Sequence, residues 1–443
     1  MRKLNRFLLK SAAALPFALL AIGSPEEAIA ATQASAAATS ASSPVDRAMD
    51  SAGIGDLGPI DTLLEGDGLT AAERLLLEAQ RAAALLRDGE AAEAIERYLM
   101  SGKASAERRL RAHSIAAGSA FAAGDYRRAS DHAAQYLAAA TPEPAREVEG
   151  MRRLKQIADL LSAEPRQRLE HGAKGQPSAI IRDKVGLLRT TIRVGSAQEQ
   201  AVIDTGANMS VASKSAARRM GLKMIEGAAA VGNSLGSGVD VRLAIAERLE
   251  IAGAVLHNSV FLVMDDEALT FPLPGGYRID TIIGLPALRA MGRLRFGPGD
   301  KLQVEAAAPA RPGASNLRVL GSDPYAVVKV SGRKHPLFFD TGANSSSVSA
   351  RLVSEHPELE MIEAGSATRA GAGKSAEVRK IRLNDVPLGI GNADAVAKSM
   401  NVEADPAPGD EDRYGVLGAD LFRLFDTVII DFGSMRLEAY DED

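Results

Sequence analysis

The chain has 443 residues, enough for two or three domains, and an apolar fraction typical of globular proteins. It contains no cysteine, which excludes disulfide bonds, thiolate catalysis and cysteine-ligated metal sites. The formal net charge of -5 comes from both signs spread along the sequence, so no basic stripe exists and nucleic acid is not an expected partner. The six histidines lack ligand spacing, and we expect no metal and no other cofactor.

Residues 1–30 have the pattern of a secretory signal peptide. Four basic residues occur by position 10, and the apolar run Ala12–Ile22 that follows is too short to span a bilayer. Ala28–Ala30 offers a small-x-small cleavage site. We therefore expect a bacterial exported protein, periplasmic or secreted. The alternative is an uncleaved membrane anchor.

Residues 31–59 are rich in Ala, Ser, Thr, Gly and Pro and are expected to form a flexible linker. The periodicity then becomes helical, and residues 60–172 are predicted to be an α-helical domain that includes a capping box at Thr70 and Glu73. Gly89 and Gly124 lie in similar segments 124 − 89 = 35 residues apart, close to the period of tetratricopeptide-like helical hairpins. Such a domain could dock a protein partner; the alternative is an unrelated helical bundle.

The second half of the chain contains an internal duplication. The pentapeptide Asp-Thr-Gly-Ala-Asn occurs at Asp204–Asn208 and again at Asp340–Asn344, each time after an apolar run that predicts a buried strand. An apolar-apolar-Gly segment follows each copy, at Thr281–Gly284 and at Gly415–Gly418. The offsets are 340 − 204 = 136 and 418 − 284 = 134 residues, so the spacing inside each half is kept within two residues.

A duplicated Asp implies a pair of carboxylates. Two carboxylates close together in a pocket cannot both ionise cheaply, so they share one proton. The ionised partner can then take a proton from a water molecule while the protonated partner bonds the carbonyl oxygen of an amide. The Thr205 and Thr341 hydroxyls can bond across to the opposite loop, and Gly206 and Gly342 allow a tight turn.

These motifs resemble those of aspartic proteases, over roughly residues 183–440. The resemblance implies an all-β double-lobed acid-protease fold, with lobes at 183–305 and 317–443, following the N-terminal all-α segment in a multidomain chain. It implies that Asp204 and Asp340 are the catalytic pair. It assigns loop support to Thr205, Gly206, Ala207, Asn208, Thr341, Gly342, Ala343 and Asn344, and the late-glycine motif to Ile282, Ile283, Gly284, Val416, Leu417 and Gly418.

Alanine at 207 and 343 makes the loops similar to those of retropepsins, so a bilobal retropepsin-like enzyme is the closest description. Retropepsins usually have Asp at the positions of Asn208 and Asn344, and commonly Arg at those of Pro286 and Asp420. We expect Asp420 to cap the following turn or helix rather than to join catalysis.

Glycine-rich segments at Val231–Gly238 and Ala370–Lys374 are candidate flaps; the alternative is that they are ordinary β-turns.

The resulting hypothesis is an exported aspartic endopeptidase acting on polypeptides. We expect a monomer, because both catalytic halves lie on one chain. The absence of a hydroxyl at Ala207 and Ala343 should leave the dyad pKa values higher than in enzymes that have one, which favours a mildly acidic to near-neutral optimum. The alternative is a catalytically silent peptide-binding or scaffold protein that uses the cleft and the helical repeats.

Overall fold

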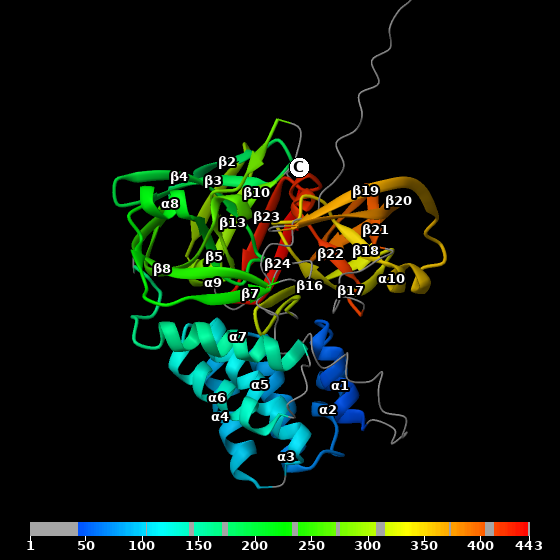
Figure 1. Ribbon diagram of the computed structural model, residues 1–443. Helices are drawn as coiled ribbons and strands as arrows, with labels where there is room; N and C mark the ends of the chain where they lie inside the picture. The colour runs from blue at the N-terminus through cyan, green and yellow to red at the C-terminus, as the bar shows by residue number, and fades with distance from the viewer. Residues whose placement is uncertain are drawn as a thin grey trace, which may run out of the picture.

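The computed structural model describes residues 43–102, 104–140, 146–170, 176–232, 238–271, 275–306, 315–371, 374–403 and 412–441. The predicted signal peptide at 1–30 and residues 31–42 lie outside the described residues. The chain forms a helical domain followed by two β lobes, the double-lobed acid-protease fold that the sequence predicts. In Figure 1 the helices form one body below the lobes, with lobe 1 in green, lobe 2 in yellow to red, and β23 and β24 between them.

The helical domain contains seven described helices: α1 (Pro44–Gly53), α2 (Gly58–Glu65), α3 (Ala71–Ala84), α4 (Asp88–Met100), α5 (Ala106–Ala122), α6 (Tyr126–Ala139) and α7 (Arg146–Leu161). The capping box before α3 forms as predicted, with Thr70 and Glu73 bonding each other's backbone N–H.

The prediction of a flexible linker is wrong for residues 44–59, which include α1 and the start of α2. Val45, Ala48, Met49 and Ala52 are all buried on one face of α1. Their i, i+3, i+4, i+7 spacing is a helical signal that the small-residue composition of the segment conceals. Ser43 caps the N-terminus of the helix, and Pro44 occupies its first position.

Consecutive helices pack as hairpins, α3 on α4 and α5 on α6. The first helices of the two hairpins, α3 and α5, start 106 − 71 = 35 residues apart, as the predicted period requires, whereas the second helices, α4 and α6, start 126 − 88 = 38 residues apart. The two glycines of the predicted repeat therefore do not correspond in structure: Gly89 lies inside α4, whereas Gly124 lies in the turn before α6 with φ of 72°. At the 38-residue offset, buried Tyr98 corresponds to buried Tyr136. The relation to tetratricopeptide repeats stays a prediction.

Lobe 1 contains β1 (Arg168–Leu169), β2 (Ser178–Arg182), β3 (Leu188–Val194), β4 (Ala197–Ile203), β5 (Ser210–Ser213), α8 (Lys214–Arg219), β6 (Lys223–Met224), β7 (Ala229–Gly232), β8 (Gly238–Ile251), β9 (Ala254–Met264), η2 (Asp266–Leu269), β10 (Thr270–Phe271), β11 (Tyr277–Arg278), β12 (Thr281–Ile283), α9 (Leu285–Met291), β13 (Arg293–Gly297) and β14 (Lys301–Glu305). Strand β2 pairs with β3 and β14, so the lobe begins before the predicted residue 183.

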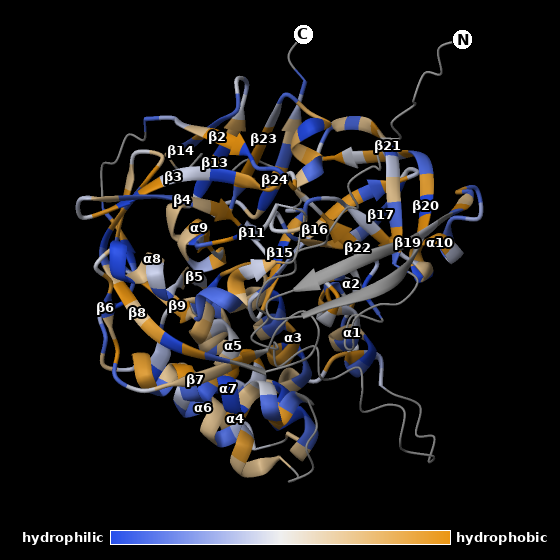
Figure 2. Ribbon diagram, turned by 45° about the horizontal axis from the view of Figure 1, so that its top comes forward, coloured by the Kyte–Doolittle hydropathy of each residue, from blue (hydrophilic) through white to orange (hydrophobic). Residues whose placement is uncertain are grey.

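Lobe 2 contains β15 (Leu317–Leu320), β16 (Asp323–Val330), β17 (Arg333–Phe339), β18 (Ser347–Ser349), α10 (Ala350–Glu355), β19 (Met361–Gly371), β20 (Lys374–Ile390), β21 (Ala393–Glu403), β22 (Gly415–Leu417), η3 (Ala419–Arg423), β23 (Thr427–Asp431) and β24 (Arg436–Tyr440). Hydrophobic and hydrophilic residues alternate along strands of both lobes, as Figure 2 shows and as the burial of β3 illustrates.

The two lobes share a sheet in which the order of strands is β24, β23, β13, β14. Strand β13 is the second-last strand of lobe 1 and β23 occupies the matching place in lobe 2, and they pair antiparallel from Arg293 opposite Asp431 to Phe296 opposite Val428. Arg293 Nη1 lies 2.7 Å from Asp431 Oδ2, and both side chains are almost fully buried. The interface between the lobes is thus a continuous sheet with a buried ion pair.

The helical domain packs against both lobes. One core cluster joins residues of α1 to α5 to residues of both lobes, and a second joins residues of α5 to α7 to lobe 1. Within the described residues, no helix combines the length and apolar character needed to span a bilayer.

Candidate active site

Asp204 and Asp340 each follow the last residue of a buried strand, β4 and β17 respectively. Each of these strands runs parallel to the late strand of its own lobe, β12 or β22. The Asp204 N–H donates to the Ile283 carbonyl, and the Asp340 N–H donates to the Leu417 carbonyl, both at 3.0 Å. The apolar-apolar-Gly segments therefore hold the two Asp residues in equivalent places.

The glycines that end these segments permit a close backbone approach. A Cβ atom at Gly284 would lie 2.6 Å from the Ala207 carbonyl oxygen, and one at Gly418 would lie 2.9 Å from that of Ala343. The N–H groups of the next residues, Leu285 and Ala419, donate to these same carbonyls at 2.8 and 2.7 Å. Only glycine fits there.

Each loop also contains one serine that the sequence analysis did not single out. Ser210 Oγ accepts from the Gly284 N–H at 3.1 Å, and Ser346 Oγ accepts from the Gly418 N–H at 2.9 Å. The signal was available, because 346 − 210 = 136 is the offset of the two Asp residues.

Thr205 and Thr341 connect the two lobes through four hydrogen bonds. The hydroxyl of Thr205 donates to the Phe339 carbonyl at 2.6 Å, and that of Thr341 donates to the Ile203 carbonyl at 2.8 Å. Each hydroxyl also accepts from the backbone N–H of the other threonine at 3.0 Å. Both side chains are fully buried, so the network fixes the two Asp loops relative to each other without competition from water.

The two carboxyl groups meet across the lobe interface. Asp204 Oδ1 accepts from the Ala207 N–H at 2.9 Å, and Asp340 Oδ1 accepts from Gly342 at 2.8 Å and Ala343 at 3.1 Å. The Oδ2 atoms are buried and have no hydrogen-bond partner among the described residues outside the carboxyl pair itself. Each loop therefore holds one carboxyl oxygen, Oδ1, with backbone N–H groups and leaves Oδ2 to the other carboxyl or to a ligand.

The central glycines place each carboxyl against the opposite loop. A Cβ atom at Gly206 would lie 2.6 Å from the Cγ of Asp340, and one at Gly342 would collide with the carboxyl of Asp204. No other residue allows this approach.

Burial raises the pKa of both carboxyl groups, and that of Asp340 reaches about 7. The proximity of Asp340 raises the pKa of Asp204 further. The pKa of Asp340 is raised less, because the hydrogen bond from the Asp204 carboxyl lowers it most, followed by its two backbone N–H bonds and the Arg413 cation. The pair therefore holds one proton over a wide pH range, with Asp204 favoured as the protonated partner.

The residues that depart from the retropepsin pattern have structural partners. Asn344 Nδ2 donates to the Val185 carbonyl of the other lobe at 2.9 Å, while Asn208 is almost fully buried in lobe 1. Asp420 lies in η3 and accepts from the Ser346 N–H and hydroxyl, at 2.8 and 2.6 Å. It thus supports the Asp340 loop and does not face the dyad.

A buried cluster at the edge of lobe 1 fixes the segment that receives Asn344. Asp183 accepts from Arg189 Nε at 2.7 Å, from the Tyr277 hydroxyl at 2.6 Å and from the N–H of Val185 at 3.0 Å. Sequence reasoning missed this cluster, because Tyr277 is distant in the chain and the three nearby members form no recognisable motif.

Both candidate flaps lie between paired antiparallel strands. In lobe 1, β7 pairs with β8 up to Gly232 opposite Gly238, and in lobe 2, β19 pairs with β20 up to Gly371 opposite Lys374. The tips at 233–237 and 372–373 lie outside the described residues.

Among the described residues, no group of three or more His, Asp or Glu side chains is arranged to hold a metal ion. Four histidines form two direct pairs. His335 and His356 are buried with their Nε2 atoms 2.8 Å apart, and His113 and His132 have their Nδ1 atoms 3.1 Å apart.

Residues 190–287 match a family model described as aspartyl protease. This stretch contains the whole Asp204 loop and its late glycine, Gly284. No curated protein matches the chain. Solved structures similar to it include basic 7S globulin from soybean, with 9% identity and a TM-score of 0.38, and conglutin gamma from lupine seeds, with 10% and 0.34. Each alignment covers 60% of this chain and 94% of the other, and likeness at this level supports no further conclusion.

Proposed function

We propose that the protein is an exported aspartic endopeptidase that hydrolyses peptide bonds between Asp204 and Asp340. The observation that carries this proposal is the pair of buried carboxyl groups, each with one oxygen held by backbone N–H groups and the other without a partner outside the pair. The aspartyl protease match over lobe 1 supports the same reaction class. A polypeptide is the substrate class.

The mechanism follows from the unequal environments of the two carboxyl groups. Asp340, favoured as the ionised partner, takes a proton from a water molecule, whose oxygen forms a bond to the scissile carbonyl carbon. Protonated Asp204 donates to the carbonyl oxygen as negative charge develops there. The C–N bond then breaks as the amide nitrogen receives a proton from the dyad, and no covalent enzyme intermediate forms.

The proposed export rests on the pattern of residues 1–30, which predicts a signal peptide and a periplasmic or secreted location. Fractionation of cells that express the full chain, with sequencing of the N-terminus of the mature protein, tests it. An intact N-terminus in the cytoplasmic fraction would reject export.

The activity is tested by incubating the mature protein with an unfolded casein-type substrate from about pH 4 to about pH 8, beside Asp204→Asn and Asp340→Asn variants. We expect cleavage by the unmodified protein, loss of cleavage in both variants and inhibition by a pepstatin-like transition-state mimic. Binding of the polypeptide without turnover would instead identify a silent peptide-binding protein.

A further inference from the structure

Helix α7 of the helical domain packs directly on the first strand of the lobe 1 hairpin. Gln156 Nε2 donates to the Ala228 carbonyl at 3.1 Å, just before β7. A Cβ atom at Gly227 would lie 2.6 Å from Cδ2 of Leu160, so the helix and the strand root are in close contact. Lys223 and Glu164 add an ion pair at 3.0 Å next to this contact.

The contact belongs to a core that reaches the active-site loop. Ile157 of α7 and Val231 of β7 are both fully buried in one apolar cluster. The same cluster includes Ala207 and Met209, three and five residues after Asp204. Helix α7 therefore closes the core on which both the hairpin and the Asp204 loop rest.

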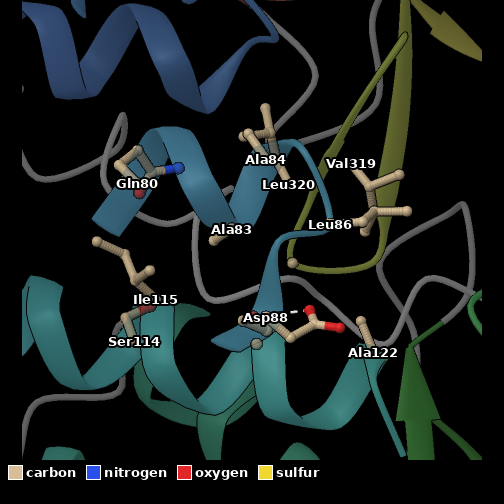
Figure 3. A pocket seen from close by; sticks show the side chains of 13 residues that line it. Gln80, Ala83, Ala84, Leu86, Asp88, Ser114, Ile115, Ala122, Val319 and Leu320 are labelled. Carbon is tan, nitrogen blue, oxygen red and sulfur yellow. Dashed lines mark hydrogen bonds between the residues drawn. The ribbon is translucent and has the colours of Figure 1, made fainter. Parts of the chain in front are cut away.

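The other end of the helical domain packs on residues 319–321 of lobe 2, which are the end of β15 and the first residue of the turn after it and are called the 319–321 turn. Figure 3 shows α3 and α5 facing Val319 and Leu320 across a narrow gap, and a Cβ atom at Gly118 would lie 3.2 Å from the Cα of Gly321. Gly55, after α1, packs on the ring of Tyr325 in β16. These approaches leave no room for a partner protein between the domain and the lobe.

This lobe 2 turn has a counterpart at the cleft of lobe 1. The ends of β3 and β16 differ by 330 − 194 = 136 residues, the offset of the two Asp residues, so Gly321 corresponds to Val185. The Val185 carbonyl accepts from Asn344, at the end of the second active-site pentapeptide. The helical domain therefore contacts the candidate flap strand β7 of lobe 1 and, in lobe 2, the counterpart of the turn that bonds Asn344.

We propose that the helical domain is a positioning element of the peptidase, with Leu160 and Gln156 holding the β7–β8 hairpin and the α3/α5 face holding the 319–321 turn. This proposal rests on the proposed function, because it concerns how that same cleft receives its polypeptide. In this proposal the helical domain does not dock a partner protein. Instead, its packing on both lobes fixes the separation of the two lobe elements between which the substrate binds. The base of the hairpin, Gly227 and Ala228, stays in contact with α7 throughout turnover.

The first test compares Leu160→Ala with Leu137→Ala, which shortens another half-buried leucine of the same core on α6. We expect Leu160→Ala to raise KM for a peptide substrate between about fivefold and about fiftyfold, with kcat and the pH profile little changed. Leu137→Ala should leave KM near the unmodified value. Equal KM effects in the two variants, or a lower kcat with an unchanged KM, would overturn the proposal.

Hydrogen exchange supplies a readout that does not depend on turnover. The β7 amides should exchange faster in Leu160→Ala than in Leu137→Ala. An unchanged exchange rate in β7 would overturn the role of α7. If the unmodified protein does not cleave, the proposed function fails, and the exchange data still decide whether α7 holds the hairpin.

The second test uses the absence of native cysteine. Gln156→Cys and Ala228→Cys are introduced together and joined by a short bis-maleimide linker, with each single variant treated in parallel as the control. We expect the linked protein to retain cleavage, because the base of the hairpin does not leave α7. Loss of cleavage only in the linked protein would overturn the proposal and show that the hairpin must separate from the helix.

Discussion

The threonine network between the lobes makes a quantitative prediction for Thr341→Val. Valine has nearly the shape of threonine but no hydroxyl, so the change removes the bond to the Ile203 carbonyl at 2.8 Å and the bond from the Thr205 N–H at 3.0 Å. Each buried group left unpaired costs about 1–3 kcal/mol, so the loss of a partner for both the Ile203 carbonyl and the Thr205 N–H should make unfolding easier by roughly 2–6 kcal/mol.

The measurement is urea unfolding of Thr341→Val beside Thr341→Ser, which keeps the hydroxyl and loses one methyl group. The Ser variant should lose less stability than the Val variant. The network also sets the position of the two Asp loops. The rate of cleavage by Thr341→Val should therefore fall even without urea, where the variant is folded.

A loss of stability below about 0.5 kcal/mol in Thr341→Val would refute this reasoning, since changes of that size are ordinary for exposed surface sites. Equal effects of Val and Ser would also refute it, because the hydroxyl would then carry none of the loss.

Four further outcomes follow from the site. Because burial raises the pKa of both dyad carboxyls and activity needs one of them ionised, the acidic limb of the pH–rate profile should lie well above the ordinary carboxyl range; a strongly acidic optimum would contradict this. The folded state binds protons more tightly than the unfolded chain at these raised sites, so the free energy of unfolding should fall as pH rises from about 4 to about 7, and Asp204→Asn should flatten that slope in urea titrations. Arg413→Met should move the acidic limb to higher pH, whereas Arg413→Lys should leave it in place, as pH–rate profiles would record. Gly206→Ala should lower kcat about a hundredfold by pushing Asp340 aside, whereas Gly53→Ala, with nothing within 4 Å of the added carbon, should not.

The doubled pentapeptide made the fold and the candidate dyad predictable, because strand, turn and glycine signals are local and were repeated. The Thr205 and Thr341 bonds followed from the same repetition. Ser210 and Ser346 were within reach of that reasoning, since they share the offset, but they stand outside the pentapeptide.

Contacts between distant segments could not be read from local patterns. The burial of α1 was hidden by a composition that is typical of linkers, although Val45 and Met49 have helical spacing. The 35-residue recurrence matched glycines that perform different tasks, one inside a helix and one in a left-handed turn. Arg413 acts on Asp340 only through the folded chain, and nothing around position 413 indicates it.

The attachment of the helical domain also makes the surroundings of the two lobes different. Two identical lobes related by a two-fold axis would accept an extended polypeptide equally well in either orientation. Here the domain contacts the strand β7 in lobe 1 but the 319–321 turn in lobe 2, and these elements do not exchange places under the pseudo-two-fold relation. If the proposed function holds, the N- and C-terminal sides of a bound polypeptide meet different surroundings, so the two orientations of one peptide should not bind equally.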